Sequence, residues 1–254
     1  MGIYITIQSA NRAEQVPLMN EALGDLMAVW YVPAAQADAY RNAGAVVRAV
    51  EGELPMKPRQ LNAALEDGFI DGHTVVTLDD DYVKSARAVW TDGKVIAKRN
   101  TLPEMIIQLA TETHETNYLL GGIAGTTNAL WANPKPQTYG MIIGAILVHK
   151  PNPLRFDENF RILEDLEYIL QHHQTYGGVH KNRDLLPEFH IFGRSATSDA
   201  KYYGGYKGYR TEERQIETLK QFEQKYPKLV FENQGLGKSV QRKIDFKNLA
   251  EGNL

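Results

Sequence analysis

The first hundred residues alternate between short β-rich runs and longer segments in which apolar residues recur at helical spacing. Buried strands produce the first pattern and surface helices produce the second. Strands are predicted at 3–7, 27–32, 45–50 and from Thr74, and helices at 16–26, 34–42 and from Pro58 onward. This β-α-β-α-β order predicts a parallel, right-handed α/β layer.

The rest of the chain predicts fewer strands. Asp92-Gly93 separates two β-prone runs, which favours a hairpin with a two-residue turn. A buried strand is predicted at 141–148, and further helices at 102–113, from Glu164 onward and at 212–226. We therefore expect an α/β fold with a mixed, mainly parallel central sheet flanked by helices.

The composition is that of an ordinary globular protein. Of the 254 residues, 43% are hydrophobic and 23% are charged. The longest apolar run, at 141–148, is far shorter than the roughly 20 residues of a membrane helix, and the N-terminus shows no signal-peptide pattern. The absence of cysteine excludes disulfides and thiolate metal sites and fits a cytoplasmic protein.

Charge is distributed unevenly along the chain. The net charge is −3, yet residues 180–254 contain 14 Lys and Arg against 10 Asp and Glu. The overall charge does not indicate a nucleic-acid-binding protein. The basic C-terminal third fits either a local polyanion-binding face or a solvated surface.

Three consecutive carboxylates, Asp79, Asp80 and Asp81, follow the strand that begins at Thr74. An unpaired carboxylate is costly to bury, so these side chains need water, a cation or a metal ion. Ligands of open α/β sheets collect at the carboxyl ends of the strands, and hard divalent ions prefer oxygen ligands. The motif indicates a Mg²⁺ or Mn²⁺ site shared with a phosphate; the alternative is an acidic turn that caps the next helix.

A second polar segment is expected at the same edge of the sheet. The first strand runs into Ser9, Asn11 and Arg12, at the end where ligands collect. These residues are candidates to hold a nucleobase or a phosphate. The alternative is that they cap the helix that follows.

The helix that starts near Pro58 carries a third group of candidates, Lys57, Arg59 and Asn62. Arg59 and Asn62 are three residues apart and share one helical face. Cations at a helix N-terminus are disfavoured by the helix dipole, which suggests that an anion binds there. The alternative is two surface cations on a solvated helix.

The second half of the chain offers a candidate base and a further metal ligand. Glu164 and Asp165 begin a helix, where they are candidates to remove a proton from an acceptor hydroxyl or are simply favoured by the helix dipole. His190 follows Glu188 in an alternating run and either completes the metal shell or is structural.

Two further segments have unusual compositions. Residues 121–128 are rich in glycine but lack the Gly-Lys-Ser/Thr ending of a phosphate-binding P-loop, so we expect a close approach of backbone, either in a turn or beside an acceptor pocket. Residues 194–214 are rich in Tyr, Gly, Lys and Arg, which suits a loop over a phosphate-bearing ligand or a nucleic-acid surface. The candidate residues of this second segment are Arg194, Lys201, Tyr206, Lys207 and Arg210.

The order of these elements resembles that of nucleotide-sugar glycosyltransferases of the GT-A type, across roughly residues 1 to 195. The resemblance implies one domain over 1–254, with a nucleotide-sugar-binding half at 1–100, an acceptor and catalytic half at 101–195 and a basic C-terminal part at 196–254. It implies a nucleoside-diphosphate sugar as donor, with a UDP-sugar expected, and Mn²⁺ or Mg²⁺ as cofactor.

The same resemblance implies roles for individual residues. Asp81 would be a metal ligand, and Asp79 would contact the ribose or the metal, with Asp80 leaving the register of the motif open. Arg59 would contact the diphosphate. Asp165 or Glu164 would be the base of an inverting transfer.

Residues 156–168, together with the Tyr- and Lys-rich segment, are also similar to the TET-associated glycosyltransferases. That family is linked to modification of hydroxymethylated pyrimidines in phage DNA, which implies DNA as acceptor and the host cytoplasm as location. Two alternatives stay open: a sugar-phosphate nucleotidyltransferase, whose glycine-rich signature is missing from residues 8–12, and a non-enzymatic DNA-associated binding protein.

Overall fold

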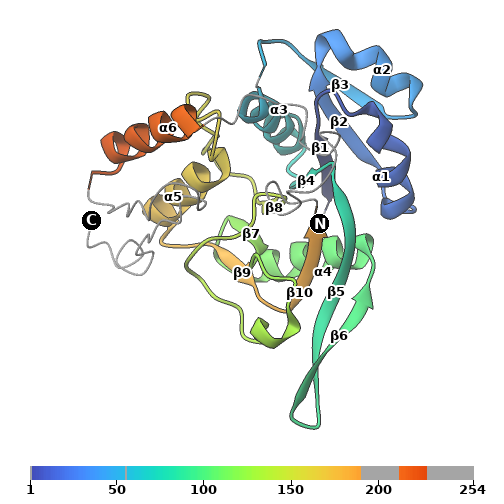
Figure 1. The fold of residues 1–254 in the computed structure, drawn as a ribbon, viewed down its shortest axis with the longest axis vertical. Helices are drawn as coiled ribbons and strands as arrows, with labels where there is room; N and C mark the ends of the chain where they lie inside the picture. The colour runs from blue at the N-terminus through green and yellow to red at the C-terminus, as the bar shows by residue number, and fades with distance from the viewer. Residues whose placement is uncertain (1, 55, 190–211, 228–254) are drawn as a thin grey trace.

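The computed structural model describes residues 2–54, 56–189 and 212–227 (Figure 1). A seven-stranded sheet with the order β3-β2-β1-β4-β8-β7-β9 forms its centre. These strands are β1 (Ile3–Gln8), β2 (Ala28–Pro33), β3 (Val46–Val50), β4 (Thr74–Asp79), β7 (Leu120–Ile123), β8 (Ile146–His149) and β9 (His180–Asn182). Strands β1 to β4 are mutually parallel where they pair, and β8 runs antiparallel to its neighbours β4 and β7. The predicted α/β class, with a mixed and mainly parallel sheet, is confirmed.

Helices cover both faces of this sheet (Figure 1). The α-helices are α1 (Val16–Leu23), α2 (Ala37–Asn42), α3 (Lys57–Ile70), α4 (Leu102–Glu115), α5 (Glu164–Tyr176) and α6 (Glu212–Lys225), and the 3-10 helices are η1 (Ala13–Gln15), η2 (Ala34–Gln36) and η3 (Ala129–Trp131). Helices α1, α2 and α4 pack on the face that carries Ile7, Trp30 and Leu78. Helices α3 and α5 pack on the opposite face, which carries Val75 and Leu147.

A long hairpin forms a second, three-stranded sheet with the order β10-β5-β6. Its strands are β5 (Tyr82–Thr91), β6 (Lys94–Asn100) and β10 (Leu185–Phe189). Asp92 and Gly93 both have positive φ, 50° and 74°, as a two-residue type I′ turn requires. The predicted hairpin is confirmed, and it projects from the body of the protein (Figure 1).

The strand predicted at 141–148 is shorter than expected, because only Ile146–His149 belong to β8. The preceding residues keep single backbone hydrogen bonds to the neighbouring strands, from Asp79 N–H to the Ala145 carbonyl and from Ile143 N–H to the Ile123 carbonyl, both at 2.9 Å. Ile142 is buried against the backbone of Gly122, and Gly144 lies directly against the side chain of Asp165. Regular strand pairing is interrupted here, where the chain lies close to both β7 and the start of α5.

The glycine-rich segment is explained by close packing at two of its positions. Gly121 and Gly122 belong to the buried strand β7. A Cβ atom on Gly121 would overlap the side chain of Thr113 in α4, and one on Gly122 would overlap Ile142. The predicted close approach of backbone is therefore present, and its neighbours there are core side chains.

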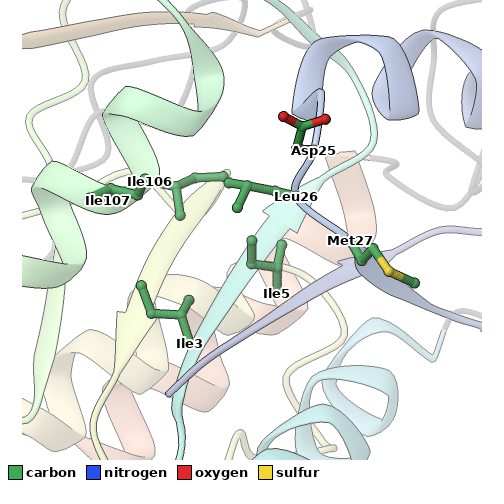
Figure 2. Close-up of a pocket in the computed structure, with 7 residues that line it drawn as sticks. All are labelled: Ile3, Ile5, Asp25, Leu26, Met27, Ile106 and Ile107. Atoms are coloured by element: carbon green, nitrogen blue, oxygen red, sulfur yellow. The ribbon is translucent and has the colours of Figure 1, made fainter. Parts of the chain in front are cut away.

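An apolar hollow of about 330 Å³ lies at the amino ends of β1 and β2 (Figure 2). Ile3, Leu26 and Ile106 are among the side chains that line it, and Asp25 adds a carboxylate to this lining. Because ligands of α/β sheets bind at the carboxyl ends of strands, this hollow is not where chemistry is expected. Within the ranges that the structure describes, no helix is both long and apolar enough to cross a bilayer.

We predict that Gly121→Ala lowers the free energy of unfolding by about 1–3 kcal/mol, because the added methyl group overpacks the contact with Thr113. Chemical denaturation of both proteins measures the difference. A second substitution in the same chain, Thr113→Ala, should recover part of the loss. No loss in Gly121→Ala would contradict this account of the contact.

Candidate functional site

The carboxyl ends of β1 and β4 bring two polar segments of the sequence together. Gln8, the last residue of β1, pairs in register with Asp79, the last residue of β4. Ser9 and Arg12 follow β1, and Asp80 follows Asp79, so all of them lie at one edge of the sheet. The pairing of Gln8 with Asp79 thus brings the residues after β1 and after β4 to the same edge of the sheet, as expected.

Arg12 is one of two cations at this edge. Its Nη1 atom lies 2.7 Å from Asp80 Oδ1 and 3.8 Å from Asp81 Oδ2. The Ser9 hydroxyl donates to the other carboxylate oxygen of Asp80 and also lies 2.6 Å from the Tyr40 hydroxyl. The Nε and Nη2 atoms of Arg12 are buried and have no hydrogen-bond partner among the described residues. Buried guanidinium donors without an acceptor favour an anion nearby.

Lys57 joins three elements of the fold. It is the first residue of α3, and its Nζ atom lies 2.7 Å from Asp79 Oδ1 and 3.5 Å from Glu164 Oε1. Burial by itself would lower the pKa of Lys57, but the carboxylates of Asp79 and Glu164 outweigh it and raise the pKa above its ordinary value. Lys57 is therefore a permanent cation between β4 and α5.

Four carboxyl groups, of Asp79, Asp80, Asp81 and Glu164, surround the two cations Arg12 and Lys57. Burial raises the pKa of Asp80 to about 6, against the opposing effect of Arg12. Burial and the charges of Asp79 and Asp80 raise the pKa of Asp81 to about 7. Asp81 Oδ1 is buried without a hydrogen-bond partner among the described residues. The edge therefore favours a further positive group.

A divalent metal ion is one group whose chemistry suits these residues. Asp79 and Asp81 offer hard carboxylate oxygens, one of them without a partner in the described structure, and Mg²⁺ is often held by one or two carboxylates with the rest of its shell from water and phosphate. No group of three or more acidic, His or Cys side chains in the described part of the chain forms a ready-made metal site. The donor set thus fits an ion that a phosphate ligand completes.

The start of α5 contributes two acids near Lys57. Glu164 is 4% exposed and faces Lys57. Asp165 accepts a hydrogen bond from the backbone N–H of Leu166 at 2.8 Å, and its side chain rests on the backbone of Gly144. Leu163, just before the helix, adopts the left-handed conformation with φ 62°. This turn directs both acids toward the edge of the sheet.

Three of the predicted binding residues have partners within the protein. Arg59 is half-exposed and binds Glu158, with Nη2 and Nε at 2.8 and 3.0 Å from Oε2. Asn62 accepts from the backbone N–H of Phe156 at 2.8 Å and donates to its carbonyl at 2.9 Å. Asn11 exchanges two hydrogen bonds with Gln36. A role toward a nucleotide stays a prediction for each of them.

The remaining candidates lie outside the described residues. His190, predicted as a metal ligand, directly follows β10. The candidates of the Tyr- and Lys-rich segment are likewise outside: Arg194, Lys201, Tyr206, Lys207 and Arg210.

Two residues of the site were not predicted from the sequence. Gln60 is fully buried in α3 and donates to the carbonyls of Ser9 and Tyr31 at 2.9 and 2.8 Å, which fixes the turn after β1. Gln60 lies one helical turn after Lys57, and this spacing could have indicated that it faces the same site. Gly144 makes room for Asp165, and its place inside an apolar run was the available signal.

Comparisons with known proteins complete the description. No family model and no curated protein matches this chain. Solved structures do show similarity, among them a crystal structure described as mannose-1-phosphate geranyltransferase from Thermus thermophilus, with 12% sequence identity and a TM-score of 0.37. The match covers 60% of this chain and 51% of that one, so this chain spans about half the length of that protein. These comparisons show no family, and the function must be inferred from the chemistry of the site.

We predict that Asp81→Asn stabilises the metal-free protein, and more so at pH 8 than at pH 5. The folded protein binds a proton at Asp81 more tightly than the unfolded chain does, so ionisation between about pH 4 and about pH 7 destabilises the fold. The Asn variant lacks this penalty and should gain about 1–3 kcal/mol at the higher pH.

Urea denaturation in EDTA at both pH values measures the effect. Burial lowers the pKa of His149 and His172, and their protonation acts in the opposite direction at acidic pH. Because both proteins contain these imidazoles, their contribution cancels in the difference, which reports Asp81 together with its charge interactions with Asp79 and Asp80. A difference that does not grow with pH would show that Asp81 has no raised pKa.

Proposed function

We propose that this protein is a metal-dependent glycosyltransferase that moves a sugar from a nucleoside-diphosphate sugar, with a UDP-sugar as expected donor, to a hydroxyl group. One observation carries the proposal. Lys57 connects Asp79 of the acidic motif to Glu164 of the α5 acids, with distances of 2.7 and 3.5 Å. The acidic motif and the first turn of α5, which carries the candidate base, are therefore joined by one lysine.

The donor would bind at the carboxyl ends of β1 and β4. Arg12 has buried donors without partners among the described residues, and Lys57 is a fixed cation, so both favour phosphate oxygens nearby. Asp79 and Asp81 would hold Mn²⁺ or Mg²⁺, which supplies charge neutralisation for the departing diphosphate. Asp80 is bound to Arg12 and Ser9, and it holds that cation in place.

Asp165 is the better candidate for the base. Glu164 is buried, and its Oε1 atom is paired with Lys57 Nζ at 3.5 Å, so it has little access to an acceptor. Asp165 is more exposed and lies at the edge of the cluster over Gly144. In the proposed step, an Asp165 carboxylate oxygen takes the proton of the acceptor hydroxyl while the hydroxyl oxygen attacks the anomeric carbon of the sugar. The bond from that carbon to the diphosphate oxygen breaks, and the nucleoside diphosphate leaves with the electron pair.

The hairpin β5–β6 supports DNA as the acceptor, and the resemblance to the TET-associated glycosyltransferases suggests a hydroxymethylated pyrimidine as the target base. It begins at Tyr82, directly after the acidic motif, and contains five Lys and Arg against one acidic residue. Lys84 and Arg87 pair with Glu188 and Asp184. Three exposed cations, Lys94, Lys98 and Arg99, have no ion pair to described residues, and Trp90 in β5 is 39% exposed. Cations and aromatic rings together favour nucleic acid.

A direct assay tests this proposal. The protein is incubated with UDP-sugars, Mn²⁺ and single-stranded oligonucleotides that contain hydroxymethylcytosine, and both UDP release and oligonucleotide mass are measured. A base must be unstacked or single-stranded to reach such a site. We expect a mass increase of one sugar that EDTA abolishes; equal turnover in EDTA would contradict the metal role, and transfer only to small hydroxyl compounds would contradict the DNA acceptor.

A second candidate is nucleotidyl transfer from a nucleoside triphosphate to a sugar phosphate. The observation that favours it is the presence of two cations, Arg12 and Lys57, at the phosphate-binding edge, since attack on an α-phosphate also needs charge neutralisation. The two reactions release different products. Pyrophosphate release from a triphosphate and a hexose 1-phosphate would support this candidate and overturn the first.

We predict that Asp165→Asn slows sugar transfer by about 10²- to 10⁴-fold, because the amide cannot accept the proton, while the donor Kd stays within about 2-fold. Asp38→Asn is the matched control, since Asp38 is 91% exposed and pairs only with Arg41 among the described residues. Single-turnover kinetics and donor titration measure the two quantities. Normal transfer by Asp165→Asn would remove this residue as the base.

We predict that Gly144→Ala also slows sugar transfer. A Cβ atom at this position would overlap the side chain of Asp165 and displace it from the site. A displacement of about 1 Å can reduce the rate by about 10²-fold. Donor binding should be retained, and unchanged single-turnover rates would show that Asp165 does not need its observed position.

A further inference from the structure

Helix α6 packs against the outer side of α5, remote in sequence from the site (Figure 1). We propose that α6 is a positioning element for the candidate base, and that Glu167, Lys225 and Tyr226 are its positioning residues. This inference rests on the proposed function, because it concerns the acids that begin α5.

The first observation is the backbone of Leu163. Its left-handed conformation, φ 62° and ψ 28°, is unfavourable for a residue with a Cβ atom and persists only where the surroundings enforce it. The chain makes this turn directly before Glu164 and Asp165. The contacts that hold Leu163 therefore also set the position of both acids.

The second observation is what holds Leu163. Its side chain packs on an apolar cluster that α6 completes. The buried members of the cluster are Phe160, Leu166, Leu170, Phe222 and Tyr226. The rings of Phe160 and Phe222 are 4.7 Å apart, and Phe222 is completely buried. Without α6, one side of the turn would face solvent.

The third observation is a buried carboxylate in the first turn of α5. Glu167 is fully buried, and its Oε1 atom accepts from Tyr226 Oη at 2.7 Å and lies 2.8 Å from Lys225 Nζ. Gln171 donates to its other oxygen at 2.7 Å. A buried carboxylate requires such partners. Lys225 and Tyr226 both lie at the end of α6, so the first turn of α5 and α6 are held together.

A fourth contact connects α6 to the loop before α5. Lys225 Nζ also lies 2.6 Å from Asp157 Oδ2, in the loop before α5. Lys225 thus joins the loop before Leu163 to the helix after it. Neither Lys225 nor Tyr226 contacts the carboxylates of the β4 motif in the described structure, so their effect on transfer would pass through the position of Asp165.

Two variants test the proposal. Tyr226→Phe removes one hydrogen bond and keeps the ring in the cluster, and Lys225→Met removes the cation and keeps an apolar chain. In both we expect kcat for transfer to fall by about 10-fold or more, with the donor KM within about 2-fold, because a displaced base affects the chemical step alone. Amide hydrogen exchange at residues 164–168 should be faster.

Two further variants serve as controls. Lys220→Met changes an exposed lysine of α6 and should leave kcat and exchange unchanged. Glu167→Gln combined with Lys225→Met removes the buried charge together with its partner, and it should recover part of the kcat lost in Lys225→Met.

The outcomes separate this proposal from the proposed function. If the wild type transfers sugar and both variants keep its kcat, or change the donor KM alone, the positioning role is overturned. If the wild type transfers no sugar, the proposed function fails. Amide hydrogen exchange then tests separately whether α6 holds the first turn of α5 in place. Faster amide exchange at residues 164–168 in the ligand-free variants would support the contacts of Lys225 and Tyr226 as what holds this turn, and unchanged exchange would overturn that role.

Discussion

The contact between Lys57 and the two carboxylates of Asp79 and Glu164 is the interaction on which the site depends. These three side chains come from the start of α3, the end of β4 and the start of α5. In the described structure, Asp79 and Glu164 are brought together by this cation, and without it their charges would repel each other in a partly buried place. The lysine therefore fixes how the two halves of the candidate site face each other.

The elements around Lys57 hold its two carboxylate partners in position. Parallel pairing of β1 with β4 brings Arg12 beside Asp80, and Gln60 fixes the turn that carries Ser9. On the far side, Leu163 and the buried Glu167 determine where α5 begins. The site is thus built between a rigid sheet edge and a helix whose first turn is held by its own set of buried contacts, which is what preorganised charge stabilisation requires.

The sequence was sufficient to predict which edge of the sheet carries the site. Strands are recognised from the local pattern of apolar residues, and ligands of α/β sheets bind at the carboxyl ends of those strands. Sequence reasoning placed Asp79 just after a buried strand, of which it is the last residue in the structure, and Glu164 at a helix start, where the structure also has it. It did not anticipate that Lys57 would reach Glu164, or that Gly144 would leave the predicted strand to make room for Asp165. Both depend on packing between distant segments, which local periodicity does not contain.

Binding of the donor tests the central claim most directly. The melting temperature of the metal-free protein is measured with UDP- and GDP-sugars, each with and without Mn²⁺. If the carboxylates and cations at the ends of β1 and β4 form a metal–diphosphate site, one donor should raise the melting temperature when Mn²⁺ is present, and either component alone should have a smaller effect. No stabilisation by any donor at millimolar concentration, with or without the ion, would contradict the account.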